Sequence, residues 1–307
     1  MDIRGTGETL GFSAQLAAIY TELARCSGLF CRKRFDWSLT EYELLLTLWE
    51  AEDALSFAQL ADFLILRTNT LWHMVPPLAD RGLVTVQNDQ KDRRLGRLQL
   101  STSGSDLVTE CCESLFAFSK GVAQESLPDT EYDRFLRTGI GRNLDVLRGH
   151  PADFELKRLP EAAQGVEFTI FIRGILEKWR QCVQDQCQLT FNEFRVLHVL
   201  SDIPSLRVQD IAERLLAPRS QVSLSKRHLR KRGLVREFSN PFDGRSVLIA
   251  LTPTGRRILE EVLPNLDAIT VPTHHPGSEE GVMVLRAWHS RMYYNLKRHH
   301  GNIVESL

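Results

Sequence analysis

The sequence predicts a mainly α-helical protein with small β-hairpins, built from two similar halves. Apolar residues recur at helical spacing along most of the chain; Phe12, Leu16 and Ile19, for example, begin a predicted helix over residues 12–33. In each half, one helix stops at a glycine and is followed by two short runs typical of β-strands. These two glycines, Gly82 and Gly233, are 151 residues apart. The same interval separates several other motifs, which indicates a repeat.

The repeated motifs occur in the same order in both halves. They are Leu60-Ala61-Asp62 with Ile211-Ala212-Glu213, Asp80-Arg81-Gly82-Leu83-Val84 with Lys231-Arg232-Gly233-Leu234-Val235, Asp92-Arg93-Arg94 with Asp243-Gly244-Arg245, and Leu100-Ser101-Thr102-Ser103-Gly104 with Leu251-Thr252-Pro253-Thr254-Gly255. A repeat of this length is a duplicated domain. We therefore predict a first unit over residues 1–148, a linker over 149–165 that contains two prolines, and a second unit over 166–307.

The stretch from 217 to 251 shows what kind of domain is repeated. Pro218 suits the first position of a helix, because its missing N–H would have no partner there. Gly233 is the expected helix stop, and no acidic residue occurs from Arg219 to Arg236. Strands are expected over 234–238 and 246–251, joined by a breaker-rich turn. A basic helix followed by a hairpin predicts a winged helix-turn-helix, whose helix enters a major groove and whose wing reaches the backbone or minor groove.

With these motifs, the sequence resembles the MarR family of transcription regulators. Leu189-Thr190 at a helix start, Ile211-Ala212-Glu213, Gly233-Leu234-Val235, the Asp243-Gly244-Arg245 wing and Leu251 to Gly255 carry the resemblance, and the first half shows the same series from Leu39-Thr40 onward. The resemblance implies a regulator, most often a repressor, that works as a dimer of one such unit. This chain then looks like both subunits fused, with two winged domains and a helical dimerisation-like body, a pseudo-dimer. The apolar faces of the first and last helices fit that body, but packing on their own domain explains them equally.

Composition restricts where a nucleic acid could bind. The formal net charge is −1, with 43% apolar and 25% charged residues. A DNA surface must therefore come from local segregation of charge. No apolar run approaches the roughly 18 residues that span a bilayer, and residues 1–11 lack a signal-peptide core. We expect a cytoplasmic protein without membrane contact, in which the six cysteines are reduced.

The second half supplies the stronger candidate site. The first turns of its basic helix carry side chains that can bond base edges; they are Arg219, Ser220, Gln221 and Ser223. Lys226, Arg227, Arg230 and Lys231 follow as candidate phosphate contacts, which position a protein without specifying sequence. Arg245 is the candidate wing contact. A run of charge is usually a solvated face, but this run falls on the helix that the topology directs at DNA.

The first half departs from this pattern. Its equivalent helix has little charge and contains Pro76-Pro77, so we expect it to bend or end early. Its candidate base contacts are Thr68, Asn69, Thr70 and His73, and its wing candidates are Arg93, Arg94 and Arg97. Trp72 would contact a base or sugar, or cover the proline kink. Asp92 and Asp243 are expected to hold the wing arginines Arg94 and Arg245 in a fixed pose.

Other functions find less support. The resemblance implies a cleft for a small aromatic or phenolic effector, and Tyr20, Arg25, Trp37 and Trp49 lie in helices that would line it. Buried aromatics are more often core, so the ligand-pocket residues stay unknown. The adjacent histidines His274-His275 and His299-His300 are expected at the surface. No catalytic motif is present, and we expect no enzyme activity, no cofactor and no metal.

The leading hypothesis is therefore a sequence-specific regulator of double-stranded DNA, acting as a monomeric pseudo-dimer, with further self-association open. The alternative is a degenerate regulator that serves as a ligand sensor or protein-interaction module with weak, non-paired DNA binding. Pro76-Pro77 favours this alternative.

Overall fold

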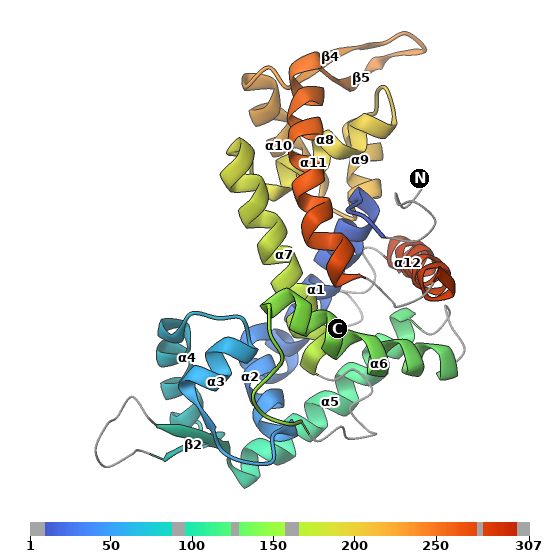
Figure 1. Ribbon diagram of the computed structural model, residues 1–307. Coiled ribbons are helices and arrows are strands. Elements are labelled where there is room, and N and C mark those ends of the chain that lie inside the picture. Colours follow the sequence, from blue (N-terminus) through green and yellow to red (C-terminus); the bar gives the residue numbers. More distant parts are fainter. Residues whose placement is uncertain (1–9, 88–95, 124–128, 157–165, 275–278, 300–307) are drawn as a thin grey trace. The chain divides into compact units, whose positions relative to one another are not determined.

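The computed structural model describes residues 10–87, 96–123, 129–156, 166–274 and 279–299 (Figure 1). As predicted, the chain is mainly helical with small antiparallel hairpins. The described residues form two compact units, one containing 24–174 and the other containing 10–23 with 175–299. We call them the first-repeat unit and the second-repeat unit. Helices α1 (Ala14–Phe35) and α7 (Val166–Cys187) each contribute residues to both units.

The first-repeat unit contains α2 (Leu39–Glu50), β1 (Leu55–Ser56), α3 (Phe57–Phe63), α4 (Thr68–Asp80), β2 (Val84–Gln87), β3 (Arg97–Leu100), α5 (Thr102–Ala123) and α6 (Asp129–Arg148). Its strands form an antiparallel sheet in the order β1-β3-β2. Val84 pairs with Leu100 and Gln87 with Arg97, so β2 and β3 form the base of a hairpin beside α4.

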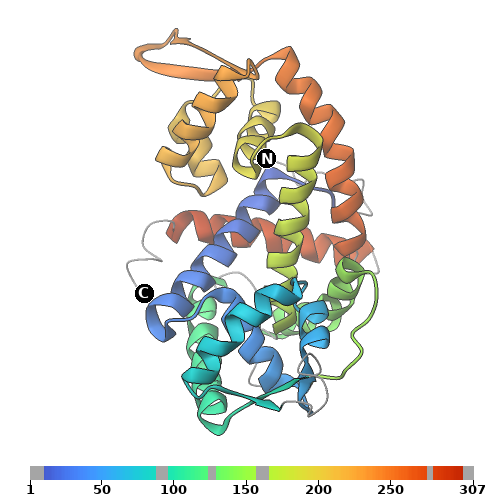
Figure 2. The same ribbon diagram turned by 90° about the vertical axis from the view of Figure 1, so that its left-hand side faces the viewer.

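The second-repeat unit has the same order of helices and the same hairpin, but an isolated bridge between Leu206 and Ile249 takes the place of strand β1. The unit contains α8 (Phe191–Asp202), α9 (Val208–Leu215), α10 (Arg219–Lys231), β4 (Val235–Asn240), β5 (Asp243–Leu251), α11 (Pro253–Thr273) and α12 (Glu279–His299). The strands β4 and β5 extend further toward the turn than predicted, and Asn240 pairs directly with Asp243. The resulting hairpin projects beyond the helices of its unit (Figure 2).

Capping boxes fix where the short helices begin. A capping box at Ser56 and Gln59 starts α3: the Gln59 N–H donates to Ser56 Oγ, and the Ser56 N–H donates to the Gln59 side chain. The same reciprocal pair starts α2, from Ser38, and α8, from Thr190. Each box satisfies N–H groups that have no partner inside the helix. The same local hydrogen bonds therefore set the start of equivalent helices, α2 and α8, in the two repeats.

Two glycines in each repeat are required by the backbone. Gly82 and Gly233 end α4 and α10 with positive φ angles of 71° and 70°, which favour a residue without Cβ. In the Leu-x-x-x-Gly motif that follows each hairpin, a Cβ on Gly104 would lie 2.1 Å from the Leu83 carbonyl oxygen, and one on Gly255 would lie 2.3 Å from that of Leu234. The repeated motif thus marks a close approach between the next helix and the first strand.

Two predictions about prolines need correction. An early end of α4 at Pro76-Pro77 was wrong, because the helix continues to Asp80 with both prolines inside; the alternative, a bend, stays a prediction. Both rings lie on the exposed side, where water can bond the carbonyls that lose a backbone donor. Pro218 is the N-cap of α10 rather than its first helical residue, because its ψ of 139° is extended.

The segment predicted as a linker packs on the first-repeat unit where the structure describes it. The Phe154 ring lies 5.0 Å from that of Phe63, Leu156 forms a β-bridge with Ala51, and His150 pairs with Asp62 at 3.1 Å. Residues 157–165 are outside the described part. None of the described helices combines the length and apolarity needed to cross a membrane.

Candidate nucleic-acid interface

Helix α10 has one buried face and one exposed, basic face. Val222, Ser225 and Leu229 are buried against the unit. Of the predicted base-reading residues, Arg219 and Ser220 are exposed, and Gln221 and Ser223 are half-buried. The predicted phosphate contacts Arg227, Arg230 and Lys231 are exposed, and Lys226 is half-buried. The structure thus places the predicted set together on and beside one face of one helix.

Two of the predicted phosphate contacts are paired with an acid that the sequence analysis missed. Lys226 Nζ forms an ion pair with Glu237 of β4, and Arg230 Nη1 donates to Glu237 Oε2 at 2.5 Å. The two cations hold the pKa of Glu237 below its ordinary value, so the carboxylate is ionised near neutral pH. Although α10 itself has no acid, two of its five lysine and arginine residues thus face a counter-ion on the wing. The sequence could have revealed Glu237, because side chains alternate between the two faces of a strand and Glu237 therefore shares a face of β4 with the buried Val235.

Arg232, the C-cap residue of α10, attaches the C-terminal end of this helix to the end of α7. Arg232 donates to the main-chain oxygens of Cys187 and Gln188, at 3.0 and 2.9 Å. In the first repeat, Arg81 donates to Phe35 and Asp36 in the same way, at 3.1 and 3.4 Å. These arginines directly precede Gly82 and Gly233, and they join each recognition helix to the end of the first helix. They therefore have a positioning role that the sequence analysis did not assign.

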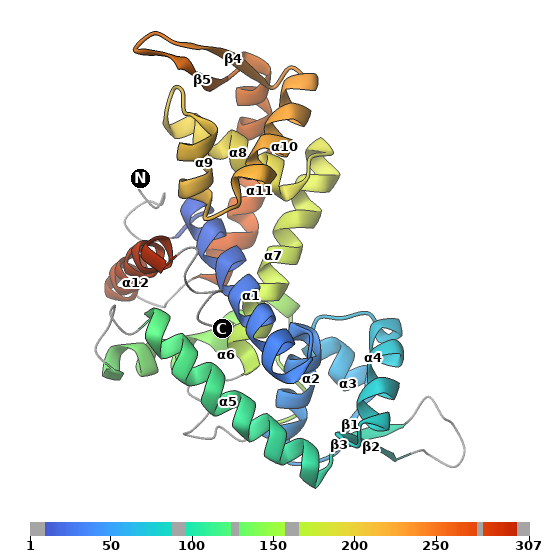
Figure 3. The ribbon, with the colours of Figure 1, turned by 180° about the vertical axis from the view of Figure 1, so that it is seen from behind.

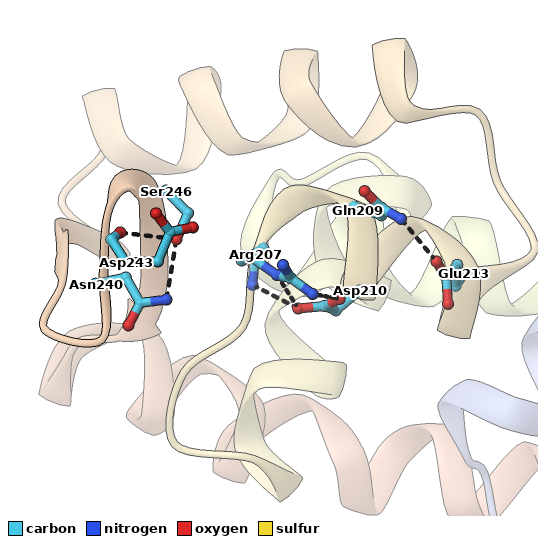
Figure 4. Close-up of polar contacts among 7 residues, drawn as sticks. All are labelled: Arg207, Gln209, Asp210, Glu213, Asn240, Asp243 and Ser246. Carbon is cyan, nitrogen blue, oxygen red and sulfur yellow. Dashed lines mark hydrogen bonds and ion pairs between the residues drawn. The ribbon is translucent and has the colours of Figure 1, made fainter.

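The turn of the second wing is held by side-chain bonds to its own backbone (Figure 4). Asn240 Nδ2 donates to Ser246 Oγ at 2.9 Å, and Ser246 Oγ donates to the Asp243 carbonyl at 3.1 Å. Asp243 Oδ1 accepts the backbone N–H of Arg245 at 3.1 Å. The predicted role of Asp243 needs correction here, because it orients the main chain of the turn rather than the Arg245 guanidinium, which is exposed.

Phe242 at this turn is a second residue that the sequence analysis did not single out. Its backbone N–H donates to Asn240 Oδ1 at 3.0 Å, and its side chain is 96% exposed. A fully exposed phenylalanine on an ordered turn has no role in the packing of its own domain. It lies beside Arg245, the predicted wing contact.

The start of α9 brings one more arginine toward the wing. Arg207 is the N-cap of α9 and pairs with Asp210 through two bonds of 2.9 Å. Asp210 and, more weakly, Asp243 raise the pKa of Arg207, and Figure 4 shows Arg207 on the side of α9 that faces the wing. One turn further, Gln209 donates to Glu213. The exposed surface of this unit thus continues from α10 across the wing to the start of α9.

The first repeat presents a different surface. Thr68, Asn69, Thr70 and His73 of α4 are exposed, as the base-contact prediction requires. Trp72 is 40% exposed, but its ring stacks on Phe57 of α3 with centroids 4.3 Å apart. The ring therefore joins α3 to α4 instead of covering a kink. This face contains little charge, so the exposed faces of α4 and α10 differ in charge among the side chains that the structure describes; a difference in DNA reading stays a prediction.

Most of the first wing lies outside the described residues, including Asp92, Arg93 and Arg94. Arg97 is described at the start of β3, where its guanidinium donates to the Ala54 carbonyl at 2.9 Å. This bond ties Arg97 to the base of the sheet, next to its pairing with Ser56. Arg97 is exposed but held at the base of the wing rather than at its tip.

The residues considered for an effector cleft are mostly core. Tyr20 and Trp37 are buried, and Tyr20 Oη lies 2.8 Å from His274 Nε2 and 3.2 Å from His289 Nε2. His274 is only 2% exposed, so its predicted surface position was wrong; it caps α11 in the interior. Trp49 is half-buried at a surface pocket of about 370 Å³ near the start of α5. All six cysteines are free thiols.

Three helices followed by an antiparallel hairpin, with a basic recognition helix in at least one copy, define a winged helix-turn-helix protein. Comparison with known families agrees. Residues 37–95 and residues 188–246 each match a model described as MarR family. The chain therefore carries two tandem MarR-family segments, as the sequence motifs predicted.

Individual relatives match only part of the chain. The HTH-type transcriptional regulator Hpr of Exiguobacterium sibiricum is 29% identical over 106 residues, which cover 34% of this chain and 54% of that protein. This chain thus spans about half the length of the curated relative that it matches. Among solved structures, YusO of Bacillus subtilis is 31% identical (TM-score 0.29, covering 32% of this chain and 68% of YusO). Sco3205 of Streptomyces coelicolor, a MarR family regulator in complex with DNA, is 24% identical (TM-score 0.30, covering 31% and 61%). Both TM-scores are low, so the similarity to the MarR family rests on the two matched segments, 37–95 and 188–246.

Proposed function

We propose that this protein is a sequence-specific, double-stranded DNA-binding transcription regulator in which one polypeptide supplies both winged domains. The observation that carries the proposal is the exposed face of α10, where Arg219 and Ser220 precede Arg227 and Lys231 on the element that winged domains insert into a major groove. Positive charge on this face releases phosphate counter-ions. Arginine and glutamine at the start of the helix can bond guanine and adenine edges.

The two repeats imply two half-sites on one duplex, about 10 bp apart between their centres. Because α4 and α10 expose different side chains, we expect an imperfect palindrome. The MarR resemblance supports repression and response to a small aromatic or phenolic effector. The half of the operator read by α10 should contribute most of the specificity.

The test uses a duplex selected from a random pool by the full-length protein. Arg219→Ala with Gln221→Ala should reduce discrimination between this duplex and a scrambled one by about 10-fold or more, since each good base contact contributes about 1–3 kcal/mol. Arg227→Ala should weaken binding to both duplexes alike and lower the salt slope by about one. Arg227 is the phosphate contact chosen for this variant, because Lys226 and Arg230 already form ion pairs with Glu237.

A second candidate function is a degenerate regulator that senses a ligand or binds a protein partner. It is favoured by the sparse charge on α4, where Thr68, Asn69 and Thr70 are the exposed residues of the first turn. Selection that yields a single half-site, or binding of equal strength to selected and scrambled duplexes, would support this candidate over paired DNA reading.

A further inference from the structure

Equivalent positions in the two repeats carry buried side chains of opposite charge. Glu43 in α2 lies five residues after the N-cap Ser38, and Arg195 in α8 lies five residues after the N-cap Thr190. Glu43 is 0% exposed and Arg195 is 1% exposed. A buried charge is tolerated only when an opposite charge or several hydrogen bonds meet it, so each position needs its own partner.

The partner of Glu43 comes from the second repeat. Arg173 of α7 donates from Nε to Glu43 Oε2 at 2.6 Å, and its Nη2 bonds the Leu64 carbonyl at the end of α3. Burial raises the pKa of Glu43, and the guanidinium opposes that shift. The helix α7 is the first helix of the second repeat, but this part of it belongs to the first-repeat unit.

Within the described residues, Arg195 also lies near a buried charge from the other repeat, with the signs exchanged, but it does not form the direct ion pair that joins Arg173 to Glu43. Arg195 Nη2 donates to the Leu215 carbonyl at 2.5 Å. Burial lowers the pKa of Arg195 to about 10, and the carboxylate of Glu22 opposes that shift. Glu22 is 1% exposed and belongs to α1, the first helix of the first repeat.

The start of α1 packs directly on α8. Just before α1, the ring of Phe12 lies 6.1 Å from that of Phe194 and 5.5 Å from that of His198. The beginning of α1 is therefore part of the second-repeat unit, and Figure 3 shows it in blue among the helices of that unit.

The two guanidinium groups bond equivalent carbonyls. Leu64 and Leu215 each precede a residue with positive φ, Ile65 at 50° and Leu216 at 49°. In the first-repeat unit the arginine comes from the incoming first helix and the acid from the winged domain. In the second-repeat unit the arginine comes from the winged domain and the acid from the incoming helix. The bond to the leucine carbonyl is the same in both units, but the elements that supply the arginine and the acid are exchanged.

We propose that the buried Glu43–Arg173 ion pair, and the buried charges of Arg195 and Glu22 with the opposite polarity, specify which first helix each winged domain accepts. The winged domain of the first repeat accepts the arginine-bearing α7, and that of the second repeat accepts the glutamate-bearing α1. Pairing of like repeats would place Glu22 against Glu43, or Arg173 against Arg195, and would bury two equal charges. Each winged domain is therefore a docking surface for the other repeat and rejects a second copy of itself. This inference does not depend on DNA binding.

The first experiment measures thermal unfolding of the full-length chain by circular dichroism. Glu43→Arg and Arg173→Glu should each lower the midpoint by about 5 °C or more, because each leaves two like charges buried. Combining them should restore most of the loss. The new guanidinium at position 43 can reach the Leu64 carbonyl as Arg195 reaches that of Leu215, and the new carboxylate at position 173 takes the role of Glu22. Glu43→Gln, which keeps the side-chain shape, should cost less than Glu43→Arg.

The second experiment tests selection rather than one ion pair. Glu43→Arg with Arg195→Glu keeps the net charge but mismatches both winged domains, so it should unfold well below the wild type. Adding Glu22→Arg and Arg173→Glu matches both again with inverted polarity and should raise the midpoint. Arg257→Glu, on the exposed side of α11 in a surface pair with Glu261, is the control and should shift the midpoint by only about 1 °C.

Two outcomes would overturn the proposal. One is a Glu43→Arg/Arg173→Glu chain that is no more stable than either single variant. The other is a Glu43→Arg/Arg195→Glu chain that unfolds at the wild-type temperature. Both are independent of any DNA measurement.

Discussion

At the scale of single residues, Glu237 controls how much of the charge on α10 is free for phosphates. Glu237→Gln removes the acid that pairs with Lys226 and Arg230. We expect tighter binding to any duplex and a salt slope that is steeper by about one to two, because each additional phosphate contact contributes about 0.9. Binding measured at several salt concentrations checks this. Glu261→Gln, on the exposed side of α11, is the control, and an unchanged slope for Glu237→Gln would count against the role of Glu237.

Phe242 permits a separate test at this scale. Apolar side chains at the tips of DNA-binding elements can wedge between base steps and kink the duplex, and Phe242 is 96% exposed beside Arg245. Phe242→Ala should weaken binding to the selected duplex by about 10-fold, because the contacts that a kinked duplex makes are lost, and should reduce DNA bending measured by gel mobility of permuted fragments. Phe238→Ala, lower on the wing, should leave bending unchanged. Equal bending by wild type and Phe242→Ala would exclude the wedge.

Patterns within one element were the most reliable signals at this scale. The exposed, basic face of α10 could be predicted because helical periodicity fixes which residues share a side. Glu237 and Arg207 were missed because their partners lie on other elements or depend on a cap. Asp243 was placed correctly in the turn, but its oxygen bonds the backbone N–H of Arg245, and the choice between backbone and guanidinium depends on turn geometry.

At the scale of elements, the prolines of α4 make a direct prediction. Pro76 and Pro77 each remove a backbone donor, yet the helix continues through them. Pro76→Ala should therefore stabilise the protein by about 2 kcal/mol, which is the helix cost of proline of about 3 kcal/mol less roughly 1 kcal/mol for the freer unfolded chain. Thermal unfolding would show a higher midpoint. A lower midpoint would mean that the ring itself is required for packing.

The limits of sequence reasoning about elements come from the same region. The rule that proline ends a helix failed because tertiary burial of Leu71, Val75 and Leu78 holds α4 along its whole length. Elsewhere local signals were sufficient, as at Ser56, where the capping box set the start of α3. Element boundaries follow from local chemistry unless burial along one face outweighs it.

At the scale of the whole molecule, the duplication could be predicted but the exchange of first helices could not. Motif spacing identifies two copies, yet the apolar faces of α1 and α7 fit either winged domain equally well by pattern. The difference lies in single buried charges such as Glu43 and Arg195, whose partners are far away in the sequence. Contacts between charged residues that are far apart in the sequence produce no periodic pattern from which they could be predicted.

The histidines in the core of the second-repeat unit make the stability of the chain depend on pH. Tyr20 of α1 contacts His274 and His289, and burial lowers the pKa of His274 to about 4 and that of His289 well below its ordinary value. Both rings are therefore neutral when folded but bind protons near pH 6.5 when unfolded. Their contribution is fully present above pH 6.5 and is lost as the pH falls toward 4.

Acidification from pH 7 to pH 4.5 should accordingly lower the unfolding midpoint of the wild type. His289→Gln removes one of the groups that the unfolded chain protonates, so its midpoint should fall less over the same range, although it starts lower because the Tyr20 contact changes. His73→Gln, on the exposed face of α4, should keep the wild-type slope. Parallel pH curves for wild type and His289→Gln would show that this buried ring does not set the acid sensitivity.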